Sequence, residues 1–261
     1  MIKFPLKGRV FMAIINLKYF SEALMVQTDF YVIIPQEAAA GEIGNDKKGG
    51  ERKNLLLLHG LSDDNTIWTR RTSIERYADK YGINVIMPSA DRSFYTDMKY
   101  GGKYYEHIAK EIPAVASSYL KLPQGRENWY VAGLSMGGYG AMKIALKEND
   151  FFSGAAALSP VTIMQNPLFA DTLVPVFGEN APIPPSEDLF CLTEEFKERK
   201  NNPRLLIING TEDFMFDDYL KFLDHIEPMG YDFKHKEYPG IHNWDFWDEH
   251  ITEVIEWMKG E

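Results

Sequence analysis

The sequence predicts a single α/β domain with a mostly parallel central sheet and helices on both faces. Short, fully apolar runs such as 55–58 and 205–208 are typical of strands that are covered on both sides. From residue 55 onward these runs alternate with longer amphipathic segments, which is the pattern of a parallel sheet. A length of 261 residues with 45% hydrophobic content allows one large core, so one domain is expected to span 1–261.

Charge and cysteine content narrow the class of protein. The formal net charge is -10, which argues against nucleic acid or an anionic membrane as a partner, because both need a basic surface. Cys191 is the single cysteine, so no disulfide forms within the chain and a reducing cytoplasm is the expected location. No stretch approaches the roughly 20 apolar residues of a membrane span.

The first fifty residues are expected to lie at the edge of the domain. Residues 1–17 are predicted to be an N-terminal extension, whose apolar run is too short for a signal sequence and lacks a small-residue cleavage site. Residues 18–24 and 30–34 are predicted to pair as an antiparallel hairpin. The polar, glycine-rich stretch 38–50 is predicted to be a hairpin loop.

Strands and helices then follow in turn. Beyond the hairpin, the predicted strands are 54–58, 84–88, 129–132, 154–158, 204–208 and 233–238. The predicted helices are 68–81, 104–122 with a bend at Pro113, the segment that opens at Met136, 187–200, 216–229 and 244–259.

One turn in this order has the pattern of a nucleophile elbow, a sharp turn from a strand into a helix with an exposed serine at its tip. Ser135 lies between Gly133 and Gly137, directly after an apolar run and before a helix of small residues. Such a turn strains the serine backbone, and the two glycines lack the Cβ atoms that would collide. The helix that opens at Met136 directs free N–H groups toward whatever the serine attacks.

A second turn follows the first central strand. His59, Gly60 and Leu61 come directly after the buried run 54–58. The glycine allows the backbone to turn at the carboxyl edge of the sheet, so the Leu61 amide could serve as an oxyanion donor beside that of Met136. A plain strand-end turn with a structural His59 explains the same residues equally well.

A serine hydroxyl is a poor nucleophile near neutral pH and needs a histidine base that is oriented by a carboxylate. In this chain order the acid follows a strand after the serine. Asp213 fits, because Gly210 allows a turn after the strand 204–208. Glu212 is expected to face the other way, and Asp217 and Asp218 are expected to open the next helix.

The base must lie after the acid, on a loop that follows the last strand. His242 satisfies this condition, because a turn at Pro239 and Gly240 leads from the strand 233–238 into the last helix. Of the other histidines after the elbow, one lies within the strand and two on helices. His107 precedes the elbow and is expected at the surface.

Two segments are expected to shape the site. Phe94, Tyr95 and Tyr100 lie on a loop at the carboxyl edge, where they either line a substrate pocket or pack the loop against the core. Residues 160–203 contain seven of the chain's 14 prolines and are predicted to form a cap insertion over the site.

With these residues assembled, the chain resembles the tributyrin-esterase group of the esterase D superfamily of α/β-hydrolases, which includes S-formylglutathione hydrolases. The resemblance runs from about residue 18 to the C-terminus and rests on the segments 57–61 with Trp68, 94–97, 132–140, 210–214 and 240–244. It implies Ser135 as nucleophile, Asp213 as acid and His242 as base, with the backbone amides of Leu61 and Met136 as oxyanion donors. The first eleven residues, 38–50 and 160–203 depart from the family pattern.

The resemblance implies a short-chain carboxylesterase that needs no cofactor and no metal, acts on a small-molecule ester and often self-associates. Gly60, Trp68 and Tyr95 are expected to contact the substrate. A feruloyl or acetyl-xylan esterase, an S-formylglutathione thioester hydrolase and a catalytically inactive binding homologue remain as alternatives.

Overall fold

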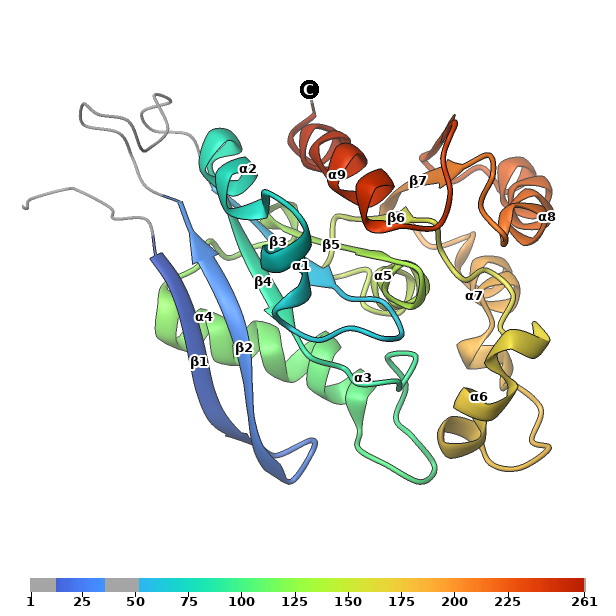
Figure 1. Cartoon of the computed structure of the whole chain (residues 1–261), viewed down its shortest axis with the longest axis horizontal. Helices are drawn as coiled ribbons and strands as arrows, with labels where there is room; N and C mark the ends of the chain where they lie inside the picture. Colours follow the sequence, from blue (N-terminus) through green and yellow to red (C-terminus); the bar gives the residue numbers. More distant parts are fainter. Residues whose placement is uncertain (1–12, 36–51, 261) are drawn as a thin grey trace, which may run out of the picture.

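The computed structural model of the chain describes residues 13–35 and 52–260 (Figure 1). These residues form one eight-stranded sheet in the order β1-β2-β4-β3-β5-β6-β7-β8. β1 pairs with β2 and β2 with β4 in antiparallel fashion, whereas every pairing from β4 to β8 is parallel. The predicted mostly parallel sheet with helices on both faces is therefore confirmed.

The edge hairpin consists of β1 (Ala13–Ser21) and β2 (Val26–Ile34), with Ala13 opposite Ile34. The strand β1 therefore includes residues 13–17, which the sequence assigned to an extension. Alternating exposure along β1 explains why these residues form a strand, because one face packs on the protein while the other faces solvent. Residues 1–12 and the predicted loop 38–50 lie outside the described residues.

The parallel strands place their carboxyl ends at one edge of the sheet, and all of them except the last, an edge strand, are largely buried. They are β3 (Lys53–Leu58), β4 (Ile83–Pro88), β5 (Trp129–Leu134), β6 (Gly154–Leu158), β7 (Arg204–Gly210) and β8 (Phe233–Tyr238). In β3, Leu56 and Leu58 join the core on one face of the sheet while Leu55 and Leu57 join the core on the other. This is why the run is apolar without alternation.

Helices cover both faces (Figure 1). The core that contains Leu55 and Leu57 is closed by α1 (Ile67–Arg71), α2 (Ile74–Tyr81) and α9 (Trp244–Lys259). The opposite core is closed by α3 (Tyr104–Glu106), α4 (Ile112–Leu120), α5 (Met136–Lys147), α7 (Leu189–Phe196) and α8 (Phe216–Ile226).

Two predicted helices are interrupted. The segment 68–81 divides into α1 and α2, because Thr72 takes an extended conformation and its hydroxyl accepts the Ile74 N–H. The segment 104–122 contains a π-helical turn, His107–Glu111, between α3 and α4. This turn ends two residues before Pro113, which lies in the first turn of α4, so the irregularity falls beside the predicted bend.

His107 is buried, which contradicts the surface position expected from the sequence. Its Nδ1 lies 2.7 Å from Glu111 Oε2 and 3.2 Å from the hydroxyl oxygens of Tyr19 and Ser21. The cover is provided by β1, which is more than eighty residues away in the sequence. Burial lowers the pKa of His107, although Glu111 opposes this shift.

Residues 160–203 lie between β6 and β7 and form an insertion that contains α6 (Ala170–Phe177) and α7. The helix α7 packs against α5 and α8, whereas α6 lies farther from the sheet (Figure 1). No helix within residues 13–35 and 52–260 is long and apolar enough to cross a membrane.

Candidate active site

Ser135 occupies the turn between β5 and α5. Its backbone has φ 53° and ψ -117°, a conformation that non-glycine residues rarely adopt. A Cβ atom on Gly133 would lie 2.5 Å from the Gly137 backbone, and one on Gly137 would lie 2.6 Å from the His59 carbonyl oxygen. Both glycines are therefore required by close backbone approach, as the elbow pattern predicted.

The start of α5 faces the same turn. The Tyr139 N–H donates to the Ser135 carbonyl at 3.1 Å, so the amide of Met136 belongs to the first helical turn and has no acceptor within the helix. The positive end of the helix dipole lies at this point and favours negative charge beside Ser135. The serine is 8% exposed, so its surroundings are largely free of bulk water.

The turn after β3 reaches the serine from the neighbouring strand. A Cβ atom on Gly60 would lie 3.8 Å from Ser135 Cβ. The Gly60 N–H donates to Asp63 Oδ2 at 3.2 Å, and the Asp63 N–H donates back to the Gly60 carbonyl at 3.3 Å. Asp63, which the sequence analysis did not single out, thus closes the turn that carries Leu61. A glycine followed three residues later by aspartate is the available sequence signal.

His59 is buried and fixes the base of this turn. Its Nε2 accepts the Ala90 N–H at 2.8 Å, so its proton must reside on Nδ1, which lies 2.7 Å from the Gly60 carbonyl oxygen and donates to it. Desolvation lowers the pKa of His59, against the attraction of the Gly60 carbonyl and nearby carboxylates. The ring is therefore a neutral structural group, as one of the two interpretations of this turn proposed.

Asp213 and His242 meet at the same edge. His242 Nδ1 lies 2.7 Å from Asp213 Oδ2, and the Met215 N–H donates to Asp213 Oδ1 at 2.9 Å. The carboxylate is completely buried, whereas the imidazole is 15% exposed. With Nδ1 bonded to the acid, Nε2 is the ring nitrogen left for proton transfer.

The loops after β7 and β8 hold this pair in place. The Glu212 N–H donates to the Gly240 carbonyl at 3.0 Å, and the Glu212 carboxylate accepts the Gly240 N–H. The Glu212 carboxylate thus binds backbone, and Asp213 is the carboxylate that contacts His242. A Cβ atom on Gly210 would lie 2.3 Å from the Gly240 carbonyl oxygen, so this glycine allows the two loops to approach.

Aromatic rings surround the imidazole. The ring centroids of Phe214 and Trp247 lie 4.8 and 4.9 Å from that of His242. Trp247 in turn packs edge to face against Trp244, with centroids 5.2 Å apart. These contacts limit the rotation of the base.

The structure corrects the substrate contacts expected for Trp68 and Tyr95. Trp68 is 1% exposed, its Nε1 donates to the Leu58 carbonyl at 3.1 Å, and its ring packs edge to face on Trp244 at 5.2 Å. Tyr95 is completely buried, and its hydroxyl donates to the His59 carbonyl at 2.8 Å. Neither side chain presents a free surface to a ligand, because both bind backbone behind the Leu61 turn.

The other two aromatic residues of this loop differ in their exposure to solvent. Phe94 is completely buried, whereas Tyr100 is 64% exposed. Packing of the loop against the core, one of the two interpretations left open, therefore holds for Phe94 and Tyr95.

Within the ranges 13–35 and 52–260, no group of three or more histidine, cysteine, aspartate or glutamate side chains is arranged to hold a metal ion.

Comparison with known proteins gives consistent matches over nearly the whole chain. A protein-family model described as "Putative esterase" matches residues 21–258. The chain is 30% identical over 262 residues to an acetyl esterase of Caldicellulosiruptor saccharolyticus, an alignment that covers 95% of this chain and 98% of that protein.

Two solved structures of hydrolases are similar to this chain over nearly its whole length. The fluorophosphonate-binding serine hydrolase F of Staphylococcus aureus superposes with a TM-score of 0.85 at 33% identity, covering 95% of this chain and 98% of that one. An S-formylglutathione hydrolase of the same organism superposes with a TM-score of 0.83 at 34% identity, covering 95% and 99%. These similarities, together with the strand order, confirm the α/β-hydrolase fold predicted from the sequence.

Proposed function

The chain belongs to this esterase family and is a carboxylic ester hydrolase, and from that premise we propose that it hydrolyses short-chain acyl esters through Ser135, His242 and Asp213. The observation that carries the proposal is the 2.7 Å bond between His242 Nδ1 and the buried Asp213, at the sheet edge where the elbow turns. A base oriented in this way is what a serine nucleophile requires.

The reaction proceeds in two halves. Ser135 Oγ attacks the acyl carbonyl carbon while His242 Nε2 takes its proton, and the carbonyl oxygen becomes an oxyanion. The amides of Leu61 and Met136 donate to that oxyanion. The bond to the leaving alcohol then breaks, and His242 returns the proton to the alcohol oxygen. Water attacks the acyl-enzyme in the same manner, releases the acid and restores the serine hydroxyl.

The charge distribution supports these roles. Asp213 stays an acceptor for two donors throughout, so it stabilises the imidazolium that forms during each proton transfer. The oxyanion develops at the positive end of α5, where the helix dipole favours it. Neutral His59 keeps its proton on the side of Gly60 and does not compete as a base.

Labelling with a fluorophosphonate tests the nucleophile directly. We expect the wild-type protein to label and to hydrolyse p-nitrophenyl acetate, and we expect Ser135→Ala to lose both properties while its thermal unfolding midpoint is unchanged. Persistent labelling of Ser135→Ala would assign the nucleophile to another residue.

A second substrate class is favoured by one comparison. The 34% identity to an S-formylglutathione hydrolase, over 95% of this chain, supports thioester hydrolysis by the same residues. Comparing kcat/KM for the glutathione thioester and for p-nitrophenyl esters of increasing acyl length separates the two classes. Feruloyl esters have less support, because Trp68, Phe94 and Tyr95 are buried and Tyr100 is the one aromatic residue singled out on the loop after β4 that is exposed.

A further inference from the structure

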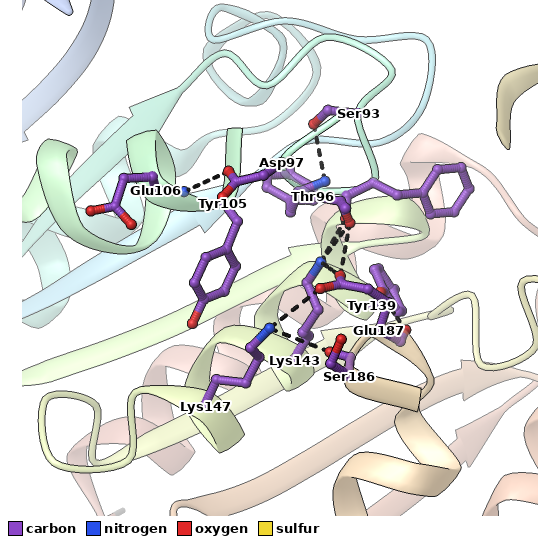
Figure 2. Close-up of polar contacts among 12 residues, drawn as sticks. Ser93, Thr96, Asp97, Tyr105, Glu106, Tyr139, Lys143, Lys147, Ser186 and Glu187 are labelled. Carbon is purple, nitrogen blue, oxygen red and sulfur yellow. Dashed lines mark hydrogen bonds and ion pairs between the residues drawn. The ribbon is translucent and has the colours of Figure 1, made fainter. Parts of the chain in front are cut away.

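A fully buried lysine lies on the elbow helix, two turns beyond the serine. Lys143 has no exposed surface, and its Nζ donates to Thr96 Oγ1 at 2.7 Å, to Glu187 Oε2 at 2.6 Å and to the Phe94 carbonyl at 3.1 Å (Figure 2). All three ammonium donors therefore have an acceptor. Desolvation lowers the pKa of Lys143 to about 8, against the attraction of Glu187.

Glu187 brings the insertion to this point. It ends the 3-10 turn Pro185–Glu187, and its Oε2 also accepts the Thr96 hydroxyl at 3.0 Å. Its backbone carbonyl accepts the Tyr139 hydroxyl at 2.6 Å, so a second residue of α5 holds the same turn. Burial alone would raise the pKa of Glu187, but the Lys143 ammonium, with Lys147 beside it, lowers the pKa. The carboxylate is therefore charged and paired.

The loop that Lys143 contacts has an unusual backbone. Phe94 and Tyr95 are consecutive non-glycine residues with φ of 50° and 53°, in the left-handed region. Such a conformation persists only where the surroundings hold it. Here the Tyr95 N–H donates to the Ser93 hydroxyl at 3.0 Å, and the Phe94 carbonyl accepts from Lys143 Nζ and lies 3.0 Å from Thr96 Oγ1, whose one proton is shared between this carbonyl and Glu187 Oε2.

Tyr95 connects this turn to the strand end beside the serine. Its hydroxyl donates to the carbonyl of His59, two residues before Leu61. Its ring lies directly on α5, because a Cβ atom on Gly140 would be 2.4 Å from the ring. A continuous set of contacts therefore leads from Lys143 through Phe94 and Tyr95 to the turn that carries Leu61.

We propose that Lys143 and Glu187 are positioning residues that hold the strained Phe94–Tyr95 turn. This turn keeps the Tyr95 hydroxyl bonded to the His59 carbonyl, and that bond keeps the Leu61 amide directed at the acyl oxygen of the substrate. The proposal rests on the proposed function, because it concerns the donor that this function assigns to Leu61. The same pair fastens residues 160–203 to α5, so the insertion and the oxyanion turn share one anchor.

A purely structural role would also make these residues sensitive to substitution. Removing one partner of a buried ion pair destabilises a fold, whereas replacing both partners by apolar residues is often tolerated. Loss of stability therefore does not test the proposal. The informative readout is the turnover of protein that remains folded, together with its dependence on Tyr95.

The test is a double-mutant cycle on kcat and kcat/KM for p-nitrophenyl acetate. We expect Tyr95→Phe and Lys143→Met each to lower both constants by about tenfold or more, because loss of an interaction made only in the transition state lowers them equally. If Lys143 acts through Tyr95, the double variant is no slower than the slower single variant. Effects that multiply, or an unchanged kcat in Lys143→Met, would overturn the proposal.

Lys143→Met removes the shorter of the two ion pairs of Glu187 and leaves Lys147 as its remaining cation, so Lys143→Met/Glu187→Met is the second variant. Its thermal unfolding midpoint should recover toward the wild-type value while kcat stays low, and wild-type kcat in this folded protein would also overturn the proposal. Lys147→Met is the matched control: Lys147 Nζ lies 3.3 Å from Glu187 Oε1 on the same helix, and Figure 2 shows it directed toward Ser186 and Glu187. Its kcat should stay within about twofold of wild type.

Failure of the proposed function is distinguishable from failure of this inference. If the wild-type protein neither labels with fluorophosphonate nor hydrolyses the ester, both the proposed function and the positioning role are wrong. If the wild-type protein does both and Lys143→Met has unchanged turnover, only the positioning role is wrong.

Discussion

Replacement of Asp213 by asparagine changes one atom of the site and has a defined consequence. Both carboxylate oxygens accept hydrogen bonds, Oδ1 from the Met215 N–H at 2.9 Å and Oδ2 from His242 Nδ1 at 2.7 Å. Asparagine offers one acceptor oxygen and one amide nitrogen that only donates. Because the Met215 N–H cannot change its character, the oxygen of Asp213→Asn must face Met215 and the amide must face His242.

The amide then donates to Nδ1, so the neutral imidazole must carry its proton on Nε2. A ring protonated at Nε2 cannot accept the Ser135 proton. The same exchange in another Ser-His-Asp enzyme lowers kcat by about 10⁴-fold, and at about 1.4 kcal/mol for each factor of ten this corresponds to roughly 5 kcal/mol of transition-state stabilisation. We expect a loss of that order here, because the buried carboxylate has no exposed surface through which water could restore the tautomer.

The assay is steady-state hydrolysis of p-nitrophenyl acetate together with the rate of fluorophosphonate labelling. Both rates should fall in Asp213→Asn, while the thermal midpoint changes little because the side chain keeps its shape. Asp217→Asn is the matched control, since this exposed aspartate lies on the first turn of α8 and faces solvent. A kcat for Asp213→Asn within tenfold of wild type, or an equal loss in Asp217→Asn, would refute the tautomer argument.

Two further predictions concern the turn beside the serine and the buried histidine. In Gly60→Ala the new methyl group would lie 2.7 Å from Leu134 Cδ1 and 2.9 Å from Asp63 Oδ2, the carboxylate oxygen that accepts the Gly60 N–H, so these side chains must move and the bond that closes the turn is disturbed. We expect kcat to fall by about 10²-fold with the protein still folded, and kcat near the wild-type value would contradict this role of the turn. Because the pKa of buried His107 is lowered, the unfolded chain binds more protons below about pH 6.5, so the free energy of unfolding should decrease as the pH falls through that window. Urea unfolding of His107→Gln between about pH 5 and 7 should show a weaker dependence, and an equal slope in both proteins would exclude His107 as the cause.

The elements that the sequence predicted well are those whose pattern is local. β3 and β7 are apolar because each is covered on both faces, and a short apolar run bounded by turn residues carries that information without its partners. The elbow was predictable for the same reason, since Gly133 and Gly137 lie within two residues of Ser135. Asp213 and His242 could be chosen because the order of the strands brings their loops to one edge.

The features that could not be predicted from the sequence depend on contacts between segments that are far apart in the chain. The aromatic character of Trp68 and Tyr95 suggested a ligand surface, but each hydrogen bonds to backbone of β3 or of the turn that follows it, and only the packed structure shows that direction. His107 looked like a surface residue because the strand that covers it is far away in the chain. The burial of Lys143 has no local sequence signal, since neither Thr96 nor Glu187 is near it in sequence.

Backbone strain marks the proposed active edge independently of side-chain chemistry. Five of the eight described non-glycine residues with positive φ follow parallel strands at that edge: Asp91, Phe94 and Tyr95 after β4, Ser135 after β5 and Ser159 after β6. Each such residue costs about 1–2 kcal/mol. The Ser135 N–H donates to the Leu158 carbonyl and the Ser159 N–H to the Ile208 carbonyl, both at 2.9 Å, so the strand pairing extends into the strained turns and holds them. Strain of this kind gathers where a function depends on it. Because it lies on both sides of the Leu61 turn, at Phe94–Tyr95 and at Ser135, the backbone alone points to the position where the proposed oxyanion donors converge.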